Sequence, residues 1–369
     1  MAGESIESAP ALKEILNRER LTHIARETAG VWPAFDRKRF MRLATEGLDD
    51  LGIMHRMRLV ATSLYETLPE DFAKAVPILE GLAPRLGHAF TAISLSEYVA
   101  LYGQRHFDRS LDALKMLTRF GSSEFAIRHF LVADFDRTIA VMRGWADNEN
   151  EHVRRLASEG SRPRLPWSFQ LKNLIVDPSP TGPILDALKA DPSLYVRKSV
   201  ANHLNDIGKD HPDRLVDRVS SWGKSDRNTA WIVRHALRTL IKKGDPLALA
   251  LIGTTGKAEV KVLDFCVDPT KINLGDRITT RVKLASTLKT VQRLVVDYAV
   301  HYPKKNGLSR KVFKLRELDL APNATVDLAI SQTVKDFTTR KHSAGFHRVE
   351  LMVNGEALAE SGFELRIQR

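Results

Sequence analysis

The stretch from Glu151 to Trp167 holds the side chains of this 369-residue chain that are best placed to do chemistry. Its sequence, EHVRRLASEGSRPRLPW, predicts a helix that stops at Gly160. Glu159 then falls in the last helical turn, where the helix dipole disfavours a carboxylate. One interpretation is that Glu159 faces a cationic ligand, since residues that are unfavourable for their local structure, such as a carboxylate at the end of a helix, are enriched at functional sites. The alternative is a solvated stripe of salt bridges, in which Glu151, Arg155 and Glu159 follow at intervals of four residues.

A tryptophan and a second glutamate extend this set. We expect a helix to restart with Pro166 near its first position, so that Trp167 lies at the start of this helix beside Arg162 and Arg164. An aromatic face with a basic rim suits a sugar-phosphate backbone, whereas a tryptophan on such a helix can equally belong to the core. Glu124 follows two serines at a predicted helix start, where a carboxylate complements the helix dipole without any catalytic role.

Residue types that are missing exclude several kinds of chemistry. Cys266 is the only cysteine, so no intramolecular disulfide can form, and we expect it in a buried strand. The 12 histidines show no metal-ligand spacing, and no glycine-rich phosphate loop or nucleophile elbow occurs. We therefore expect neither a metal nor a cofactor. The N-terminal sequence lacks a signal pattern and no apolar stretch is long enough for a membrane span, so we expect a cytosolic protein.

Helices are expected to position these side chains up to about residue 258. Apolar residues recur at i, i+3, i+4 and i+7 in segments such as AKAVPILEGL and SLDALKMLTRF. Three segments carry a Val-Arg pair after a polar turn, and the pairs are 43 and 37 residues apart. A repeat near 40 residues is typical of HEAT-type helical pairs, which stack into a solenoid. The arginines Arg154, Arg197 and Arg234 either bind turn aspartates such as Asp191 or contact phosphates.

Beyond residue 258 the hydrophobic period changes from 3.6 to 2, which predicts strands. Asn354-Gly355 is a strong hairpin signal. We expect about seven strands, which suits a β-sandwich of immunoglobulin-like type, after a linker at residues 253–256. The sequence therefore predicts a multidomain α plus all-β protein, with an α-solenoid of HEAT-like repeats over residues 1–258 and the β-sandwich over 259–369. The alternating apolar positions are clearest at Leu294, Val296, Tyr298, Val300 and Tyr302.

The net charge of +11 favours a polyanionic partner, of which nucleic acid is the commonest. Residues 259–369 hold 19 Lys and Arg against 13 Asp and Glu, a surplus of 6. The longer helical part has a surplus of only 5. The smaller domain is therefore the more basic one per residue, and we expect both domains to face nucleic acid.

Three segments of the chain resemble a known family. SEFAIRHFL, NEHVRRLASEGSRPRLPW and DPSLYVRKSVANHLNDI are similar to segments of the HEAT-like-repeat DNA glycosylases, and the chain is closest to the AlkC branch. The resemblance implies hydrolysis of the N-glycosidic bond of cationic alkylated bases, such as 3-methyladenine and 3-methylcytosine, in double-stranded DNA. An abasic site would remain, without conventional base flipping and without strand cleavage. A non-enzymatic HEAT scaffold and a damaged-DNA-binding protein are the alternatives.

The resemblance also implies roles for individual residues. Trp167 resembles the aromatic residue that packs against the deoxyribose, and Glu124 and Glu159 resemble the acidic residues near the glycosidic bond. The AlkD branch has an aspartate and an additional tryptophan instead, so the glutamate that positions water stays open. We expect a monomer in the bacterial cytosol, associated with the nucleoid.

Basic residues of both domains are candidates for contacts with the DNA backbone. In the helical part each of them can also belong to a solvated helix face. In the small domain the segment HYPKKNGLSRK predicts a basic hairpin that reaches the DNA, or else a charged edge that prevents aggregation. The candidates are Arg162, Arg164, Lys198, Arg238, Lys242, Lys243, Lys304, Lys305, Arg310 and Lys311.

Overall fold

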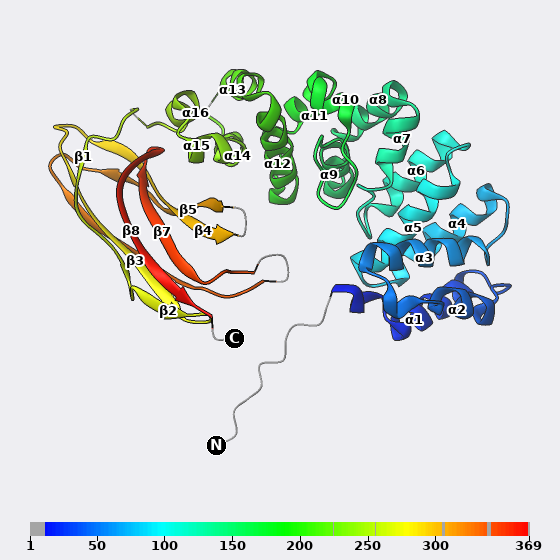
Figure 1. Cartoon of the computed structure of the whole chain (residues 1–369). Helices are drawn as coiled ribbons and strands as arrows, with labels where there is room; N and C mark the ends of the chain where they lie inside the picture. Colours follow the sequence, from blue (N-terminus) through cyan, green and yellow to red (C-terminus); the bar gives the residue numbers. More distant parts are fainter. Residues whose placement is uncertain (1–11, 224, 255, 305–306, 338–340, 368–369) are drawn as a thin grey trace. The chain divides into compact units, whose positions relative to one another are not determined.

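The computed structural model describes residues 12–223, 225–254, 256–304, 307–337 and 341–367 (Figure 1). The chain forms two compact units. The first comprises Met1–Asp210 and Trp222–Ala236, and the second comprises His211–Ser221 and Leu237–Arg369.

The first unit consists of helices, several of which begin at a capping side chain. Asp71, Asp134 and Asn150 each accept a hydrogen bond from a backbone N–H in the first turn of α4, α8 and α9. In the described residues the α-helices of this unit are α1 Arg18–Val31, α2 Arg37–Thr45, α3 Ile53–Tyr65, α4 Phe72–Leu82, α5 Ala89–Tyr102, α6 Phe107–Leu117, α7 Ile127–Ala133, α8 Phe135–Trp145, α9 Glu151–Gly160, α10 Lys172–Val176, α11 Gly182–Ala187, α12 Leu194–Asp210 and α14 Arg227–Ala236. Short 3₁₀ helices lie at Leu12–Leu16, Leu48–Asp50, Ala83–Arg85 and Ser179–Thr181.

The three Val-Arg segments lie on helices that pack in succession. Helix α12 contacts both α9 and α14, and the three valines are buried. Arg154 pairs with Asp191 through two hydrogen bonds of 2.6 and 3.2 Å, as the structural interpretation of these arginines predicts. Arg197 donates instead to the backbone oxygens of Asp191 and Pro192. The repeat signal therefore marks stacked helices, in which Arg154 binds the turn of the next repeat and Arg197 binds the turn before its own helix.

In its described residues the second unit contains two β-sheets and three helices. The three-stranded sheet has the order β1-β3-β6, and the five-stranded sheet has the order β2-β8-β7-β4-β5. All pairs are antiparallel except β2 with β8. The strands are β1 Val260–Asp268, β2 Lys271–Asn273, β3 Arg277–Ser286, β4 Gln292–Lys304, β5 Gly307–Leu320, β6 Thr325–Thr333, β7 Gly345–Val353 and β8 Glu356–Arg366, and the helices are α13 Pro212–Ser221, α15 Arg238–Lys243 and α16 Pro246–Leu251.

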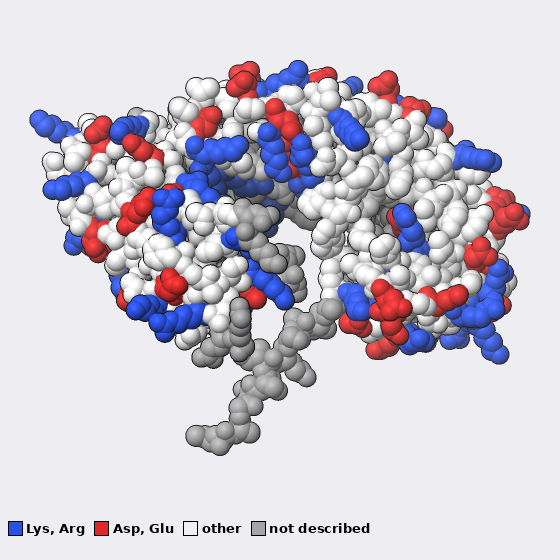
Figure 2. Space-filling view, viewed as in Figure 1, with Lys and Arg blue, Asp and Glu red and all other residues white. Residues whose placement is uncertain are grey.

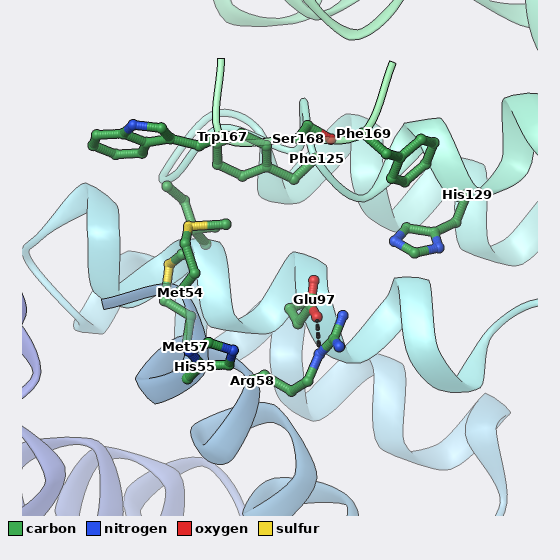
Figure 3. A pocket seen from close by; sticks show the side chains of 11 residues that line it. Met54, His55, Met57, Arg58, Glu97, Phe125, His129, Trp167, Ser168 and Phe169 are labelled. Atoms are coloured by element: carbon green, nitrogen blue, oxygen red, sulfur yellow. Dashed lines mark hydrogen bonds and ion pairs between the residues drawn. The ribbon is translucent and has the colours of Figure 1, made fainter. Parts of the chain in front are cut away.

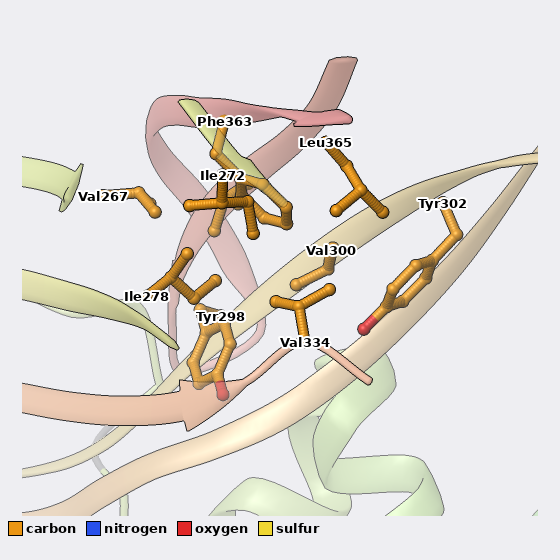
Figure 4. Close-up of a cluster of buried hydrophobic side chains, with 10 residues drawn as sticks. Val267, Ile272, Ile278, Tyr298, Val300, Tyr302, Val334, Phe363 and Leu365 are labelled. Carbon is orange, nitrogen blue, oxygen red and sulfur yellow. The ribbon is translucent and has the colours of Figure 1, made fainter. Parts of the chain in front are cut away.

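The core of the second unit contains side chains from both sheets. Val267 and Ile278 of the smaller sheet cluster with Tyr298, Val300 and residues of β7 and β8 (Figure 4). The alternating residues of β4 are all buried, as their period predicts. Eight strands occur in the described residues, against about seven predicted. Cys266 lies in β1 as expected, although it is only half-buried.

The Asn354-Gly355 turn joins β7 to β8, as predicted. Both residues have positive φ, 48° and 84°, which suits the tight hairpin turn in which Val353 pairs with Glu356. Gly355 is also fixed by its surroundings, because a Cβ there would lie 2.1 Å from Cα of Gly244. A side chain at residue 355 would therefore push the end of α15 away from the hairpin.

The change of secondary structure and the division into compact units fall at different places. Helix α16 ends at Leu251 and β1 begins at Val260, so the change of period near residue 258 marks the change from helices to strands. Helices α13, α15 and α16 nevertheless belong to the second compact unit. Helix α15 is held there because Lys242 donates to the Val312 carbonyl of β5 at 3.1 Å and because Gly244 approaches Gly355.

Candidate active site

Helix α9 ends at Gly160, where no larger residue fits. A Cβ at this position would lie 2.5 Å from Cγ2 of Ile127 and 3.3 Å from Cε of Met142. The end of α9 is thus packed against α7 and α8, and Glu159 is only 5% exposed. The alternative that places Glu159 in a solvated stripe of salt bridges is therefore wrong. At the other end of the helix, Glu151 accepts a hydrogen bond from the Ser193 hydroxyl.

Two arginines compensate the charge of Glu159. Its Oε1 atom accepts a hydrogen bond of 2.7 Å from Arg162 and lies 3.6 Å from Nη2 of Arg155. Arg162 also donates to Asp206 of α12 at 2.8 Å, and Lys209 pairs with the other oxygen of Asp206. The unfavourable position at the helix end is thus offset by cations, one of which is fixed by a residue 44 positions further along the chain.

Glu124 shares one of these arginines. Its Oε2 atom accepts a hydrogen bond of 2.6 Å from Nη1 of Arg155 and one of 2.7 Å from the Ser122 hydroxyl. Glu124 lies in a turn and α7 begins only at Ile127, so the carboxylate is not part of a first helical turn, contrary to the alternative based on the helix dipole. The guanidinium of Arg155 therefore joins two glutamates that are 35 residues apart.

Each glutamate uses one oxygen for these contacts. In the described part of the chain, Oε1 of Glu124 and Oε2 of Glu159 have no hydrogen-bond donor. Neither atom is among the enclosed polar atoms that lack a partner, so both reach solvent. The pair is held rigidly through one oxygen each and offers the other oxygen to a water molecule or a developing positive charge.

The arginines of this cluster stay charged. Burial by itself would lower the pKa of Arg155, but the attraction of Glu124 and Glu159 outweighs burial and raises it. The pKa of Arg162 is raised for the same reason by Glu159 and Asp206, against the opposing effect of burial. Both guanidinium groups therefore carry a positive charge over the whole physiological pH range.

His203 lies beneath this cluster as a neutral ring. Its Nδ1 atom is 2.9 Å from the Ser158 carbonyl, which assigns the proton to Nδ1. Burial lowers the pKa of His203 from 6.5 to about 4. The ring therefore adds no positive charge near the glutamates at neutral pH.

The lowered pKa of His203 makes stability depend on pH. In the unfolded chain the ring binds a proton below pH 6.5, whereas in the folded chain it does so only near pH 4. The stabilisation of the folded chain by the neutral ring is fully present above pH 6.5. It is lost as the pH falls from 6.5 to 4, where the free energy of unfolding is lower by roughly 3 kcal/mol. Urea unfolding of the wild type and of His203→Asn, whose amide can still donate to Ser158, measures this loss. Equal pH dependence of the two proteins would contradict it.

Trp167 lies in a loop and not in a helix. The helix predicted to restart at Pro166 is wrong, because residues 161–171 form no helix and α10 begins only at Lys172. Pro163 and Pro166 disfavour a helical conformation of the residues before them. Trp167 itself has φ of +65°, a conformation that costs energy for any residue except glycine, and its side chain is 61% exposed.

A buried arginine holds this loop in place. Arg128 of α7 is fully buried and donates to the backbone oxygens of Gly160, Arg162 and Phe169, at 3.0, 2.7 and 2.5 Å. Burial lowers the pKa of Arg128 to about 10, which still leaves the group charged at neutral pH. The loop that carries Trp167 is thus fixed at its beginning and near its end by one side chain.

Trp167 borders a pocket of about 220 Å³ in the first unit. Phe125, Trp167 and Phe169 form one side of it, and α3 and α5 form the other (Figure 3). On the side of the helices Arg58 donates to Glu97 at 2.8 Å. Phe125 directly follows Glu124 in the turn before α7, and Trp167 lies in the loop that follows Glu159 and the end of α9. The pocket therefore adjoins both glutamates along the chain.

Several residues of this region were not found by sequence reasoning. Tyr195 lies under Arg155, with the guanidinium carbon 4.6 Å from the ring centre, but its segment indicated only a repeat. Burial raises the pKa of the Tyr195 hydroxyl, so it stays protonated. Arg128 could have been suspected, since it is a charged residue in the run AIRHFLVA, which is apolar apart from Arg128 and His129. Glu97 and Phe125 carry no comparable signal.

The candidate DNA contacts divide into enclosed and exposed side chains. Arg162 is buried between Glu159 and Asp206, so we do not assign it a phosphate contact. Arg164 pairs with Asp210 through hydrogen bonds of 2.9 and 2.8 Å, and Arg310 pairs with Glu350 at 3.2 Å. On the visible face of each unit, cationic and anionic side chains are interspersed (Figure 2).

The remaining candidates also differ in exposure. Lys198, Lys243 and Lys311 are exposed, and Lys304 is exposed and donates to the Lys341 carbonyl. Arg238 and Lys242 are half-buried. The predicted basic hairpin corresponds to β4 and β5, in which Lys304 pairs with Gly307, and Lys305 lies outside the described residues.

The described residues contain neither a candidate metal site nor a helix that could span a membrane. No group of three or more His, Cys, Asp or Glu side chains among them could hold a metal ion. No helix among them is both long and apolar enough to cross a membrane.

Comparison with known proteins gives matches over nearly the whole chain. Residues 115–240 match the family described as "DNA alkylation repair enzyme", and residues 261–367 match "Uncharacterised protein YhaZ, C-terminal Ig-like domain". "Uncharacterized protein YhaZ" of Bacillus subtilis (strain 168) is 41% identical over 356 residues, which are 96% of this chain and 99% of that protein.

A solved structure is more similar still. Pseudomonas fluorescens alkylpurine DNA glycosylase AlkC, bound to DNA containing an abasic site analog, is 53% identical with a TM-score of 0.94, over 97% of this chain and 100% of that chain. These matches confirm the predicted fold class, a helical region followed by an immunoglobulin-like domain. Since they extend over both parts of the chain, the protein belongs to the AlkC family of alkylpurine DNA glycosylases.

Proposed function

We propose that this protein hydrolyses the N-glycosidic bond of cationic alkylated bases, 3-methyladenine and 3-methylcytosine, in double-stranded DNA. The bond between C1′ and the base nitrogen breaks, and its electron pair neutralises the departing base. The oxygen of a water molecule then bonds to C1′ and loses a proton, which leaves an abasic site. A base that already carries a positive charge is a good leaving group, so the protein mainly has to stabilise the positively charged sugar.

The pair of glutamates joined by Arg155 is the observation that carries this proposal. Both carboxylates are fixed through one oxygen, and the free oxygens of Glu124 and Glu159 can hold the attacking water and face the oxocarbenium ion. Because the arginines orient the carboxylates before the reaction, little reorganisation is needed as charge develops.

Trp167 supplies the aromatic face for the sugar in this proposal. Its ring is exposed on a loop whose backbone Arg128 fixes, and an indole attracts a nearby cation by about 0.5–2 kcal/mol. Trp167→Ala is therefore expected to slow excision about 2- to 30-fold under single-turnover conditions, with Trp167→Phe in between. The positive φ of residue 167 stays in both variants, so a melting temperature close to that of the wild type is the control. A fully active alanine variant would contradict this role.

Double-stranded DNA is the partner that we propose for both parts of the chain. The helical region, residues 1–258, would carry catalysis, and the immunoglobulin-like domain, residues 259–369, would contact DNA through its basic surface. The exposed cations are the proposed phosphate contacts, together with arginines whose carboxylate partners are partly exposed. They are Arg164, Lys198, Lys243, Lys304, Arg310 and Lys311. We further propose that the protein is a cytosolic monomer and that the lesion stays largely stacked until its bond breaks.

The direct test is a single-turnover excision assay. The protein is incubated with a duplex that holds one 3-methyladenine, and abasic sites are detected by alkaline cleavage of the strand. We expect complete conversion without strand cleavage before alkali is added, since the proposal contains no Schiff base. Tight binding of the duplex without release of the base would overturn the proposal and favour a damage-binding protein.

A further inference from the structure

The pocket beside Trp167 has two chemically different sides. Phe125, Trp167 and Phe169 offer aromatic surface, and the facing helices offer one ion pair, between Arg58 and Glu97 (Figure 3). An aromatic surface opposite a small number of polar groups is how proteins bind a planar heterocycle, by stacking on its face and hydrogen bonding at its edge. None of these side chains has a task in the hydrolysis proposed above except Trp167.

One carboxylate oxygen of Glu97, Oε2, can accept a hydrogen bond on the side of the pocket. Arg58 binds it through Oε1 only, and in the described residues Oε2 has no hydrogen-bond donor. Figure 3 shows one oxygen directed at Arg58 and the other directed toward the aromatic side chains. The carboxylate side chain is 14% exposed, so a ligand that reached Oε2 would remove it almost completely from water. Such a site favours a ligand that donates a hydrogen bond.

The size of the pocket limits the ligand. About 220 Å³ lies below the range of roughly 300–1,000 Å³ that holds drug-sized molecules. A single nucleobase fits this limit, whereas a nucleotide with its sugar and phosphate exceeds it. Among the described residues that line the pocket, Arg58 is the only Lys or Arg side chain, and it is already paired with Glu97, so the pocket offers no free side chain of this kind to a phosphate.

We propose that this pocket binds the released nucleobase and that Glu97 selects bases that carry an exocyclic amino group. The inference rests on the proposed function, since it concerns the product of that reaction. After cleavage the base is neutral and planar. Its ring packs against Phe125 and Trp167, and its amino group donates to Oε2 of Glu97. Adenine-type and cytosine-type bases share such an amino group, whereas bases with a carbonyl oxygen at the same position present a second acceptor to the carboxylate.

The experiment compares two free bases that differ at this one group. Isothermal titration calorimetry with 3-methyladenine and with 3-methylhypoxanthine, whose amino group is replaced by oxygen, measures both affinities for the full-length protein. We expect 3-methyladenine to bind at least about 10-fold more tightly, the ratio that one hydrogen bond of about 1.4 kcal/mol gives. Equal affinities, or no binding of 3-methyladenine up to its solubility limit, would overturn the proposal.

Substitution of Glu97 sharpens the comparison. In Glu97→Gln the new amide oxygen is held by Arg58, so its NH₂ group faces the pocket and donates instead of accepting. The preference is then expected to reverse in favour of 3-methylhypoxanthine. Glu80→Gln is the matched control, because Glu80 is also paired with an arginine, Arg109, but lies outside the pocket. A Glu97 variant that keeps the wild-type preference would overturn the role of Glu97.

The same preparations are assayed for excision, which separates the two proposals. Excision of 3-methyladenine from duplex DNA together with absent or unselective base binding means that the pocket proposal fails and the proposed function stands. Selective base binding without excision means that the proposed function fails, and that the site binds amino-substituted bases for another purpose. Phe125→Leu is expected to lower the affinities for both bases by the same factor, because it reduces stacking on the ring and leaves Glu97 in place.

Discussion

Replacing Glu159 by glutamine is expected to slow the release of 3-methyladenine about 100-fold or more, while the affinity for DNA changes little. Glutamine keeps the shape and the acceptor for Arg162 but removes the negative charge that faces the developing oxocarbenium ion. Loss of one preorganised electrostatic contact of this kind typically costs 10²–10³ in rate. Single-turnover excision and fluorescence anisotropy with a duplex measure the two quantities separately.

Glu124→Gln tests the other member of the pair. Arg155 joins both carboxylates, so removing either charge leaves the guanidinium with one partner fewer. We expect a loss of similar size, and a double variant that loses less than the product of the two single effects, since residues that act as a unit are not additive. If one glutamate orients water, only its variant will respond to a stronger external nucleophile such as added azide.

Glu151→Gln is the control for both variants. Glu151 lies in the first turn of α9, two turns away from Glu159, and its carboxylate contacts Ser193. Its substitution removes the same charge from the same helix without touching the pair, and excision should stay within about twofold of the wild type. Equal activity of all three variants would contradict the proposed roles of Glu124 and Glu159.

Arg128→Met is expected to lower the stability of the protein by several kcal/mol and to reduce excision in the fraction that still folds. The substitution leaves the carbonyl oxygens of Gly160, Arg162 and Phe169 without their donor, and each buried unsatisfied group costs about 1–3 kcal/mol. The loop that carries Trp167 then loses the side chain that binds its backbone at its beginning and near its end. Thermal unfolding followed by circular dichroism measures the first effect, and excision at 10 °C measures the second.

Two further variants separate anchoring from a general loss of stability. Arg128→Lys retains one charged donor and should recover part of both properties. Arg137→Met removes an arginine of α8 that is 49% exposed and paired with the exposed Asp108, and a change of less than about 1 kcal/mol is expected. If Arg128→Met unfolds at the temperature of the wild type and is fully active, Arg128 does not hold the loop.

Sequence patterns within one segment were sufficient to predict the secondary structure where the segment packs against neighbours of the same kind. The Val-Arg segments lie on α9, α12 and α14, and each repeat meets a neighbour of the same kind. The strands after residue 258 follow from their period of two, and the Asn354-Gly355 hairpin follows from the positive φ that only such residues adopt easily.

Local signals failed wherever a distant residue supplies the compensation. The run after Gly160 predicts a helix at Trp167, but Arg128 binds three carbonyl oxygens and so stabilises a loop in which Trp167 has positive φ. The salt-bridge stripe of α9 suggests a solvated Glu159, but α7 and α8 enclose the end of this helix. The helix dipole suggests an isolated Glu124, but it shares Arg155 with Glu159.

The sequence by itself determined the succession of a helical repeat region and an immunoglobulin-like domain, the position of Glu159 at a helix end and the family resemblance that its surroundings carry. Hydrophobic period, glycine and turn residues act over a few positions, so a single segment contains this information. Only the tertiary structure decided that Glu124 and Glu159 share Arg155, that Arg162 is buried against Asp206 and that Glu97 faces Phe125 across a pocket. The members of these three pairs, Glu124 and Glu159, Arg162 and Asp206, and Glu97 and Phe125, are 28 to 44 positions apart in the chain. A buried charge is stable only where packing brings it a partner.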